Sequence, residues 1–160
     1  MAYPKFKRGA HAPKGLKPEV VEQELQRIYD QSGGILEART LWTESADEDA
    51  PLHSAFTWDD SVAGPLWRDQ EARGLIRCVS LAEDPQSKAG RKGWVHVTVG
   101  DVSGYQPTVV AMANPDTRAQ VIGEAREDLA AARRRLADLE GSVKAVKAVD
   151  AAMVEVANMA

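Results

Sequence analysis

Cysteine is almost absent from this chain of 160 residues, and the single thiol, Cys78, excludes a disulfide within the chain. That usage is typical of the reducing cytoplasm. Its apolar neighbours Ile76 and Val79 predict a buried strand and a packed, inert thiol rather than a nucleophile. Long apolar runs are missing too, and no apolar segment follows the basic N-terminus. We therefore expect neither a membrane span nor a signal peptide.

Motifs for catalysis and for metal or cofactor binding are also missing. The histidines His11, His53 and His96 are far apart and lack the spacing of metal ligands. The acidic loop 47–51 lacks the alternating ligands and central glycine of a calcium loop. The glycine pair 33–34 has no Walker lysine, and no segment resembles a nucleophile elbow. The sequence predicts a protein that is not an enzyme and uses no cofactor or metal.

The chain has no large excess of either charge. It contains 20 Lys and Arg and 24 Asp and Glu, which gives a formal net charge of −4. This balance argues against a wholly electrostatic nucleic-acid binder and leaves room for a locally basic one. Residues 1–17 are basic, contain no acidic residue and are broken by prolines and glycines. We interpret them as a flexible arm: either a solubilising tail or a segment that orders on DNA or an acidic protein. The candidate contacts, in this arm and in the loop near residue 90, are Lys5, Lys7, Arg8, Lys14, Lys17, Arg91 and Lys92.

Hydrophobic residues make up 44% of the chain, and their periodicity predicts an α+β fold. Pro18 suits the first turn of a helix, and the glycine pair ends it. The alternation in WVHVTVG is that of a strand. We predict an α+β core domain over 18–113 with an N-terminal helical subdomain and a small antiparallel β-meander. Its predicted helices are 18–31, 35–46 and 60–75, and its strands are about 75–81, 93–99 and 105–112.

Two alternatives remain within this domain. Pro65 allows the third helix to begin late, after Gly64. Three short helices around a glycine turn also suggest a helix-turn-helix. However, Glu37 and Glu44 on the candidate recognition helix would repel phosphates, which favours an ordinary helical subdomain.

The C-terminal segment 114–160 predicts one long helix with a coiled-coil-like seam. Asn114 and Pro115 form a strong helix start, and no proline follows. Gly141 weakens the helix by about 1 kcal/mol and would allow a helical hairpin instead, but the seam continues across it, which favours one helix. Asp150 falls on the seam, where a carboxylate without a partner is unfavourable. The predicted self-association residues are Ile122, Leu129, Leu136, Leu139, Val143, Val146 and Met153.

Three motifs carry a resemblance to a known family. They are PLHSAFTWDDS at 51–61, QEARGLIR at 70–77, and the step at Pro115 and Asp116 before Arg118 and Gln120. Over about residues 18–140 the chain resembles an uncharacterised family of small proteins encoded by tailed phages, prophages and bacteria. The resemblance implies a phage setting and a non-catalytic accessory role.

These observations combine into one expectation and one alternative. We expect a phage-type accessory or interaction protein, in the host cytoplasm or the virion, that forms homo-oligomers through its C-terminal helix. Its basic arm would contact DNA or an acidic protein surface. The alternative is a structural component of the phage particle, a capsid or tail accessory protein, that does not bind DNA.

Overall fold

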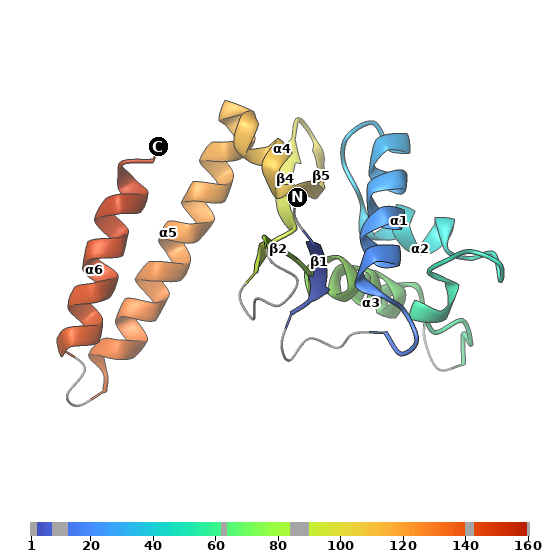
Figure 1. Cartoon of the computed structure of the whole chain (residues 1–160), viewed down its shortest axis with the longest axis horizontal. Helices are drawn as coiled ribbons and strands as arrows, with labels where there is room; N and C mark the ends of the chain where they lie inside the picture. The colour runs from blue at the N-terminus through green and yellow to red at the C-terminus, as the bar shows by residue number, and fades with distance from the viewer. Residues whose placement is uncertain (1–2, 8–12, 62–63, 84–89, 140–142, 160) are drawn as a thin grey trace. The chain divides into compact units, whose positions relative to one another are not determined.

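The computed structural model describes residues 3–7, 13–61, 64–83, 90–139 and 143–159. The chain divides into two compact units, residues 1–110 and 111–160, and each is described by itself. Helices and small antiparallel sheets make up the first, and helices alone make up almost all of the second (Figure 1). The predicted α+β class is confirmed, as is the presence of a long helix in the C-terminal part of the chain.

The first unit packs helices against two small sheets. Its helical elements are α1 (Pro18–Gln31), α2 (Ala38–Glu44), the 3-10 turn η1 (His53–Ala55) and α3 (Pro65–Cys78). One sheet has the strand order β1-β2-β3, with β1 (Tyr3–Phe6), β2 (Val79–Ala82) and β3 (Arg91–Lys92). The other pairs β4 (Trp94–Val99) with β5 (Val102–Pro107). All these pairings are antiparallel.

The core of this unit forms where one face of α1 meets α2, α3 and the strands. Val21, Leu25 and Ile28 recur at helical spacing and are almost fully buried. Tyr29 and Trp94 pack in a T-shaped arrangement, with ring centroids 5.6 Å apart. The Trp94 indole N–H donates to the Glu22 carboxylate at 2.9 Å, so burying this tryptophan leaves its polar atom satisfied.

Two local predictions for the first half of the chain are confirmed. Pro18 occupies the first turn of α1. Gly33 and Gly34 follow the helix with φ of 72° and 92°, the left-handed region that suits glycine. Their turn leads to Leu36, which exchanges backbone hydrogen bonds of 2.9 and 2.8 Å with Tyr105. That bridge holds the chain extended, so α2 begins at Ala38 rather than at the predicted residue 35.

The third helix is shifted toward the C-terminus relative to the predicted 60–75. Gly64 is its N-cap and Pro65 its first residue, as the late-start alternative required. It continues to Cys78, so the strand predicted from residue 75 begins only at Val79. Leu75 and Ile76 are apolar because they face the core from a helix, beside Ala72. Periodicity alone does not separate such a short apolar run from a strand.

The predicted single meander is wrong, because the strands belong to two separate sheets. The β4–β5 ribbon turns at Gly100, whose φ is 60°, and Val99 pairs with Val102. The predicted strand 105–112 ends at Pro107, and α4 (Thr108–Ala113) follows. The Thr108 hydroxyl donates to the Lys92 carbonyl at 2.7 Å, which ties the start of this helix to the end of β3.

The arm predicted over 1–17 is not wholly irregular, which corrects the interpretation of a flexible segment. Residues 3–6 form β1 and pair with all four residues of β2. The Lys7 N–H extends the ladder by donating to the Cys78 carbonyl at 2.8 Å. The Phe6 side chain packs against the core. Pro4 is tolerated because β1 lies at an edge of its sheet, where one side of the strand needs no donor.

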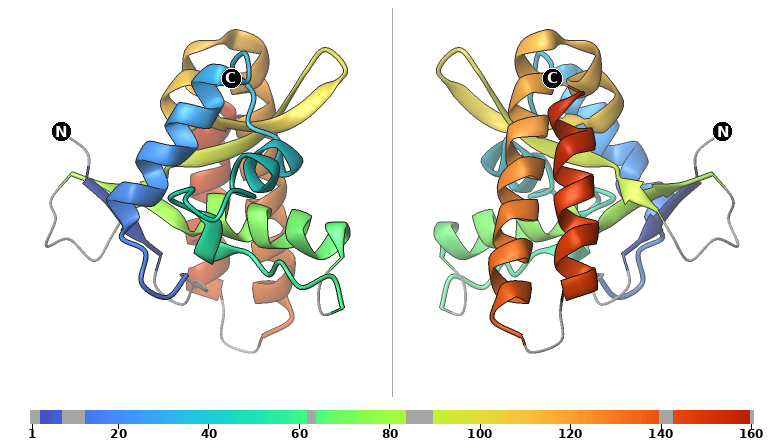
Figure 2. Two further views of the ribbon diagram at one scale, coloured as in Figure 1. Left: turned by 90° about the vertical axis from the view of Figure 1, so that its right-hand side faces the viewer. Right: turned by 90° about the vertical axis from the view of Figure 1, so that its left-hand side faces the viewer.

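The second unit corrects the prediction of a single continuous helix over 114–160. Asn114 caps α5 (Pro115–Ala137), its side chain accepting the Asp116 N–H at 2.9 Å. The helix ends before Asp138, and α6 (Val143–Ala157) runs back beside it, as Figures 1 and 2 both show. Gly141 lies outside the described residues. The hairpin, left as an alternative by the sequence, is the observed arrangement.

Polar contacts fix the antiparallel register of the hairpin. Arg133 and Asp150 form an ion pair of 2.5 Å between the two helices. Arg126 and Arg118 of α5 donate to backbone carbonyls near the end of α6, at 3.0 and 2.9 Å. Asp150 thus has a charged partner in the hairpin. In one continuous helix its carboxylate would fall on the apolar seam, where it is unfavourable without a partner.

Candidate functional site

Sheet pairing collects basic side chains from sequence-distant segments onto one face of the β1-β2-β3 sheet. Lys5 pairs with Ser80, and Ser80 pairs with Lys92 on its other side. Directly opposed residues of antiparallel strands project to the same face. Lys5 and Lys92 therefore flank Ser80 on one face, about 10 Å apart across two strand spacings.

Lys7 extends this group, because it lies two residues after Lys5 on the same face. Burial lowers the pKa of the Lys7 ammonium most, and the positive charge of Lys92 lowers it further. The smaller effects of Cys78 and Arg77 on this pKa oppose each other, since Cys78 raises it and Arg77 lowers it. Among the described residues no carboxylate contributes to this shift. We name Lys5, Lys7, Arg77 and Lys92 the basic patch. An anion placed there would relieve the repulsion between these charges.

The backbone beneath the basic patch is closely packed. The Ser80 hydroxyl donates to the Lys5 carbonyl at 3.1 Å, linking the two strands beyond the regular ladder. A Cβ at Gly90 would lie 2.9 Å from Lys5 Cε and 3.0 Å from Ser80 Oγ. Glycine at this position leaves room for the Lys5 stem beside β3.

The other predicted anion contacts lie elsewhere or outside the described residues. Arg91 pairs with Leu81, so its side chain belongs to the opposite face of the sheet. Lys14 and Lys17 are exposed in the loop before α1. Arg8 lies outside the described residues. Arg77 was missed from the sequence, because an arginine at the end of a helix carries no local sign of a partner sheet.

The predicted self-association residues are distributed unevenly along the α5–α6 hairpin. Ile122 is buried. Four others are half-buried: Leu129, Leu136, Val146 and Met153. Leu139 and Val143 are 59% and 65% exposed and flank the segment between the helices, so they do not continue a seam as one long helix would require.

α6 carries more apolar surface than α5 covers. Its only polar residues are Lys144, Lys147, Asp150 and Glu155, yet none of its residues is buried. A helix that is apolar most of the way round is usually an interior helix. The apolar side chains of α6 therefore remain available for a further contact.

The motif at 51–61 forms a structural cluster around one buried arginine. Arg68 is 7% exposed, and its guanidinium lies 5.6 and 5.5 Å from the ring centres of Trp42 and Trp58. It donates to the carbonyls of Thr57 and Trp58 and pairs with Asp60. Packing and hydrogen bonding around Arg68 thus account for Thr57, Trp58 and Asp60 of this motif.

His53 and the other described histidine take structural roles as well. His53 stacks on Trp58 at a centroid distance of 4.9 Å, and its Nδ1 lies 3.1 Å from the Ser45 carbonyl oxygen. His96 and Tyr105 form a T-shaped ring pair with a centroid distance of 5.2 Å. Across the described ranges, no three His, Cys, Asp or Glu side chains are grouped as metal ligands. No helix within those ranges has the length and apolarity to cross a membrane.

Cys78 is buried, as the sequence predicted, although it ends a helix rather than lying in a strand. Burial raises the pKa of its thiol to about 11, against a smaller opposing effect of the Lys7 charge. The thiol donates to the Leu75 carbonyl at 3.0 Å. These contacts make it a packed core residue.

Comparisons of the chain with protein-family models, with curated proteins and with solved structures found no match. The resemblance to phage-encoded proteins therefore stays a prediction.

Proposed function

We propose that this protein is a non-enzymatic, self-associating interaction protein that binds the phosphate backbone of DNA through its basic patch. The observation that carries the proposal is the gathering of Lys5, Lys7 and Lys92 on one sheet face, with Arg77 in electrostatic reach. Clustered cations of this kind bind phosphates by releasing counterions and need no base-specific contact.

DNA is favoured over an acidic protein by the kind of residues in the patch. Lysines on long stems adapt to a regular array of phosphates and act as point charges. The arginine fork binds carboxylates and phosphates alike with defined geometry, so a patch made mainly of lysines favours a sequence-independent, electrostatic contact with phosphates over a specific carboxylate site. α2, the candidate recognition helix, is no alternative reader of DNA. It has seven residues, buries Ala38 and Leu41, and is flanked by Glu37.

Self-association through the α5–α6 hairpin is the second part of the proposal. Two helices of this length bury too little surface to be stable in isolation, whereas two hairpins pair readily into a four-helix bundle. α6 supplies the apolar side chains for that contact, including Val154, which is 62% exposed. Pairing also places two basic patches in one assembly, which raises the overall affinity for a DNA that reaches both.

The biological setting rests on the family resemblance of residues 51–61 and 70–77, which supports an accessory role in a phage or prophage. The alternative is a structural protein of the particle that self-associates and does not bind DNA. The two differ in one observable, the affinity for DNA.

Self-association is tested by light scattering on the full chain at high micromolar concentration. We expect a dimer or larger oligomer, and Val154→Gln should shift it toward monomer. Glu155→Gln, a neighbouring exposed change on α6, should leave the mass unchanged. A strictly monomeric wild-type chain would refute this part of the proposal.

DNA binding is tested by fluorescence anisotropy with a labelled 20-base-pair duplex at about 50 mM salt. We expect Lys7→Gln combined with Lys92→Gln to weaken binding at least about tenfold. The control combines Arg39→Gln with Lys147→Gln, which changes the net charge equally outside the patch. Equal affinities of the two variants would refute the assignment of the patch. Oligomers without DNA binding would favour the structural alternative.

A further inference from the structure

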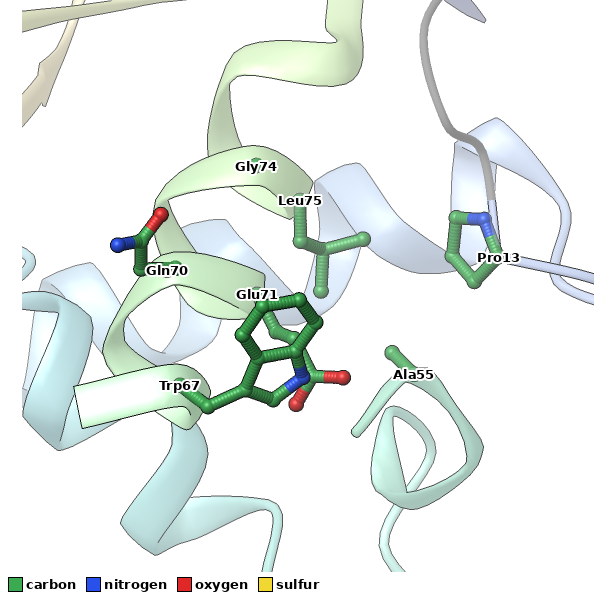
Figure 3. Close-up of a pocket in the computed structure, with 7 residues that line it drawn as sticks. All are labelled: Pro13, Ala55, Trp67, Gln70, Glu71, Gly74 and Leu75. Carbon is green, nitrogen blue, oxygen red and sulfur yellow. The ribbon is translucent and has the colours of Figure 1, made fainter. Parts of the chain in front are cut away.

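A pocket of about 420 Å³ opens along one side of α3 (Figure 3), and none of its described lining residues belongs to the basic patch. Its volume lies in the range of small-molecule sites. Leu75 and Ala55 give it apolar walls, while Trp67 and Glu71 contribute an aromatic ring and a carboxylate. The pocket lies within the first unit and takes no part in the proposed DNA contact.

Trp67 and Glu71 are four residues apart on α3, so they lie on the same face of the helix. Figure 3 shows the indole ring and the carboxylate together at the pocket. Trp67 is 56% exposed, an unusual position for the largest apolar side chain. The face of an indole attracts cations.

The Glu71 carboxylate is held in place before any ligand arrives. One oxygen accepts the Thr57 backbone N–H at 3.1 Å, and the other accepts the Thr57 hydroxyl at 2.7 Å. Both oxygens retain a lone pair. Within the described part of the chain, Glu71 forms no ion pair. A fixed carboxylate beside an exposed indole is suited to a positively charged group.

Gly74 leaves the adjoining part of the pocket open. It lies in the middle of a helix, where glycine is about 1 kcal/mol less favourable than alanine. A Cβ at this position would meet no atom within 4 Å. Packing within the chain therefore does not require glycine here, and its absent side chain leaves space beside Leu75.

We propose that this pocket binds an organic cation, a guanidinium or ammonium group on an apolar stem. The charged group lies between the Trp67 ring and the Glu71 carboxylate, and the stem lies over Gly74 against Leu75 and Ala55. The cation is either a free small molecule or the side chain of a polypeptide partner, since both present the same chemistry.

The test is a titration of the full-length ¹⁵N-labelled protein with n-butylguanidinium at constant ionic strength, followed by NMR. We expect saturable shifts of the Trp67 indole N–H and the Gly74 amide, with a dissociation constant on the order of 1 mM. n-Butylurea has the same shape without the charge and should bind at least about fivefold more weakly. Equal binding of the two compounds, or no shift at these two positions, would overturn the proposal.

Variants separate binding from folding. Glu71→Gln retains a contact with the Thr57 hydroxyl and should weaken n-butylguanidinium binding at least about fivefold. Gly74→Leu should abolish binding by filling the space, without lowering the thermal midpoint. The matched control is Gly123→Leu on α5, where a Cβ likewise meets no atom within 4 Å. Unchanged binding in Gly74→Leu would overturn the site.

A blocked Ala-Arg-Ala tripeptide distinguishes the two sources of the cation. Tighter binding than n-butylguanidinium supports a polypeptide side chain as the ligand. Exclusion of the tripeptide while n-butylguanidinium binds supports a free small cation.

Discussion

Lys5 and Lys92 flank Ser80 in one row of the β1-β2-β3 sheet, each paired directly with it. Part of the basic N-terminal segment, residues 3–6, therefore belongs to the folded sheet. Deleting it would remove a strand as well as its charges, and loss of binding would then have two explanations. Substitutions that neutralise the lysines and leave the backbone pairing intact test the electrostatic role alone.

The hairpin predicts where a cross-link will form in the second unit. In a Cys78→Ser background, Arg133→Cys and Asp150→Cys should be joined within one chain by a short bismaleimide, because these side chains face each other across the helices. A continuous helix pairing antiparallel with a second copy would bring the same positions together between chains. Denaturing gels distinguish the two outcomes, and a cross-linked dimer would contradict the hairpin.

Arg68 should be among the most sensitive positions of the first unit. Arg68→Lys keeps the charge but loses the planar contacts with Trp42 and Trp58 and part of the hydrogen bonding. We expect the free energy of unfolding to fall by about 2 kcal/mol, measured by urea denaturation. Arg73→Lys on the same helix is exposed and should change the free energy by less than about 0.5 kcal/mol. Similar effects of the two substitutions would contradict the cluster.

Cys78 makes stability depend on pH in the alkaline range. Its pKa is about 11 in the folded protein and near 9 in an unfolded chain, so the unfolded state releases the proton first. The buried, neutral thiol contributes on the order of 2 kcal/mol to the free energy of unfolding. This contribution is fully present below pH 9 and is lost as the pH rises toward 11. Cys78→Ala should remove this part of the decline in unfolding free energy between pH 9 and 11. An identical pH profile in the variant would refute the burial argument.

Local signals predicted those parts of the fold that depend on neighbouring residues. Pro18 starts α1, the glycines at 33 and 34 end it, and Asn114 caps α5 through its own side chain. The alternation of β4 identified a strand. Each of these features requires only contacts within a few residues, which the sequence displays directly.

Long-range pairing accounts for what the sequence did not predict. β1 has only four residues and contains a proline, so its own sequence does not predict a strand. It becomes one because it pairs with β2. The lysines at 5, 7 and 92 were candidate contacts from composition, but their common face depends on sheet register. The apolar repeat runs across Gly141 as it would in one continuous helix, and only the contacts between α5 and α6, which leave Leu139 and Val143 exposed, favour the hairpin.

The salt dependence of DNA affinity is the most direct test of the central claim, that the basic patch binds phosphates. For the wild-type protein, log K should fall linearly with log salt, with a slope of about −3 or steeper for three to four neutralised phosphates. Lys7→Gln with Lys92→Gln should make the slope shallower by about 2 per bound protomer, and the Arg39→Gln with Lys147→Gln control should keep the wild-type slope. A wild-type slope near zero, or one that the patch variant leaves unchanged, would contradict the account.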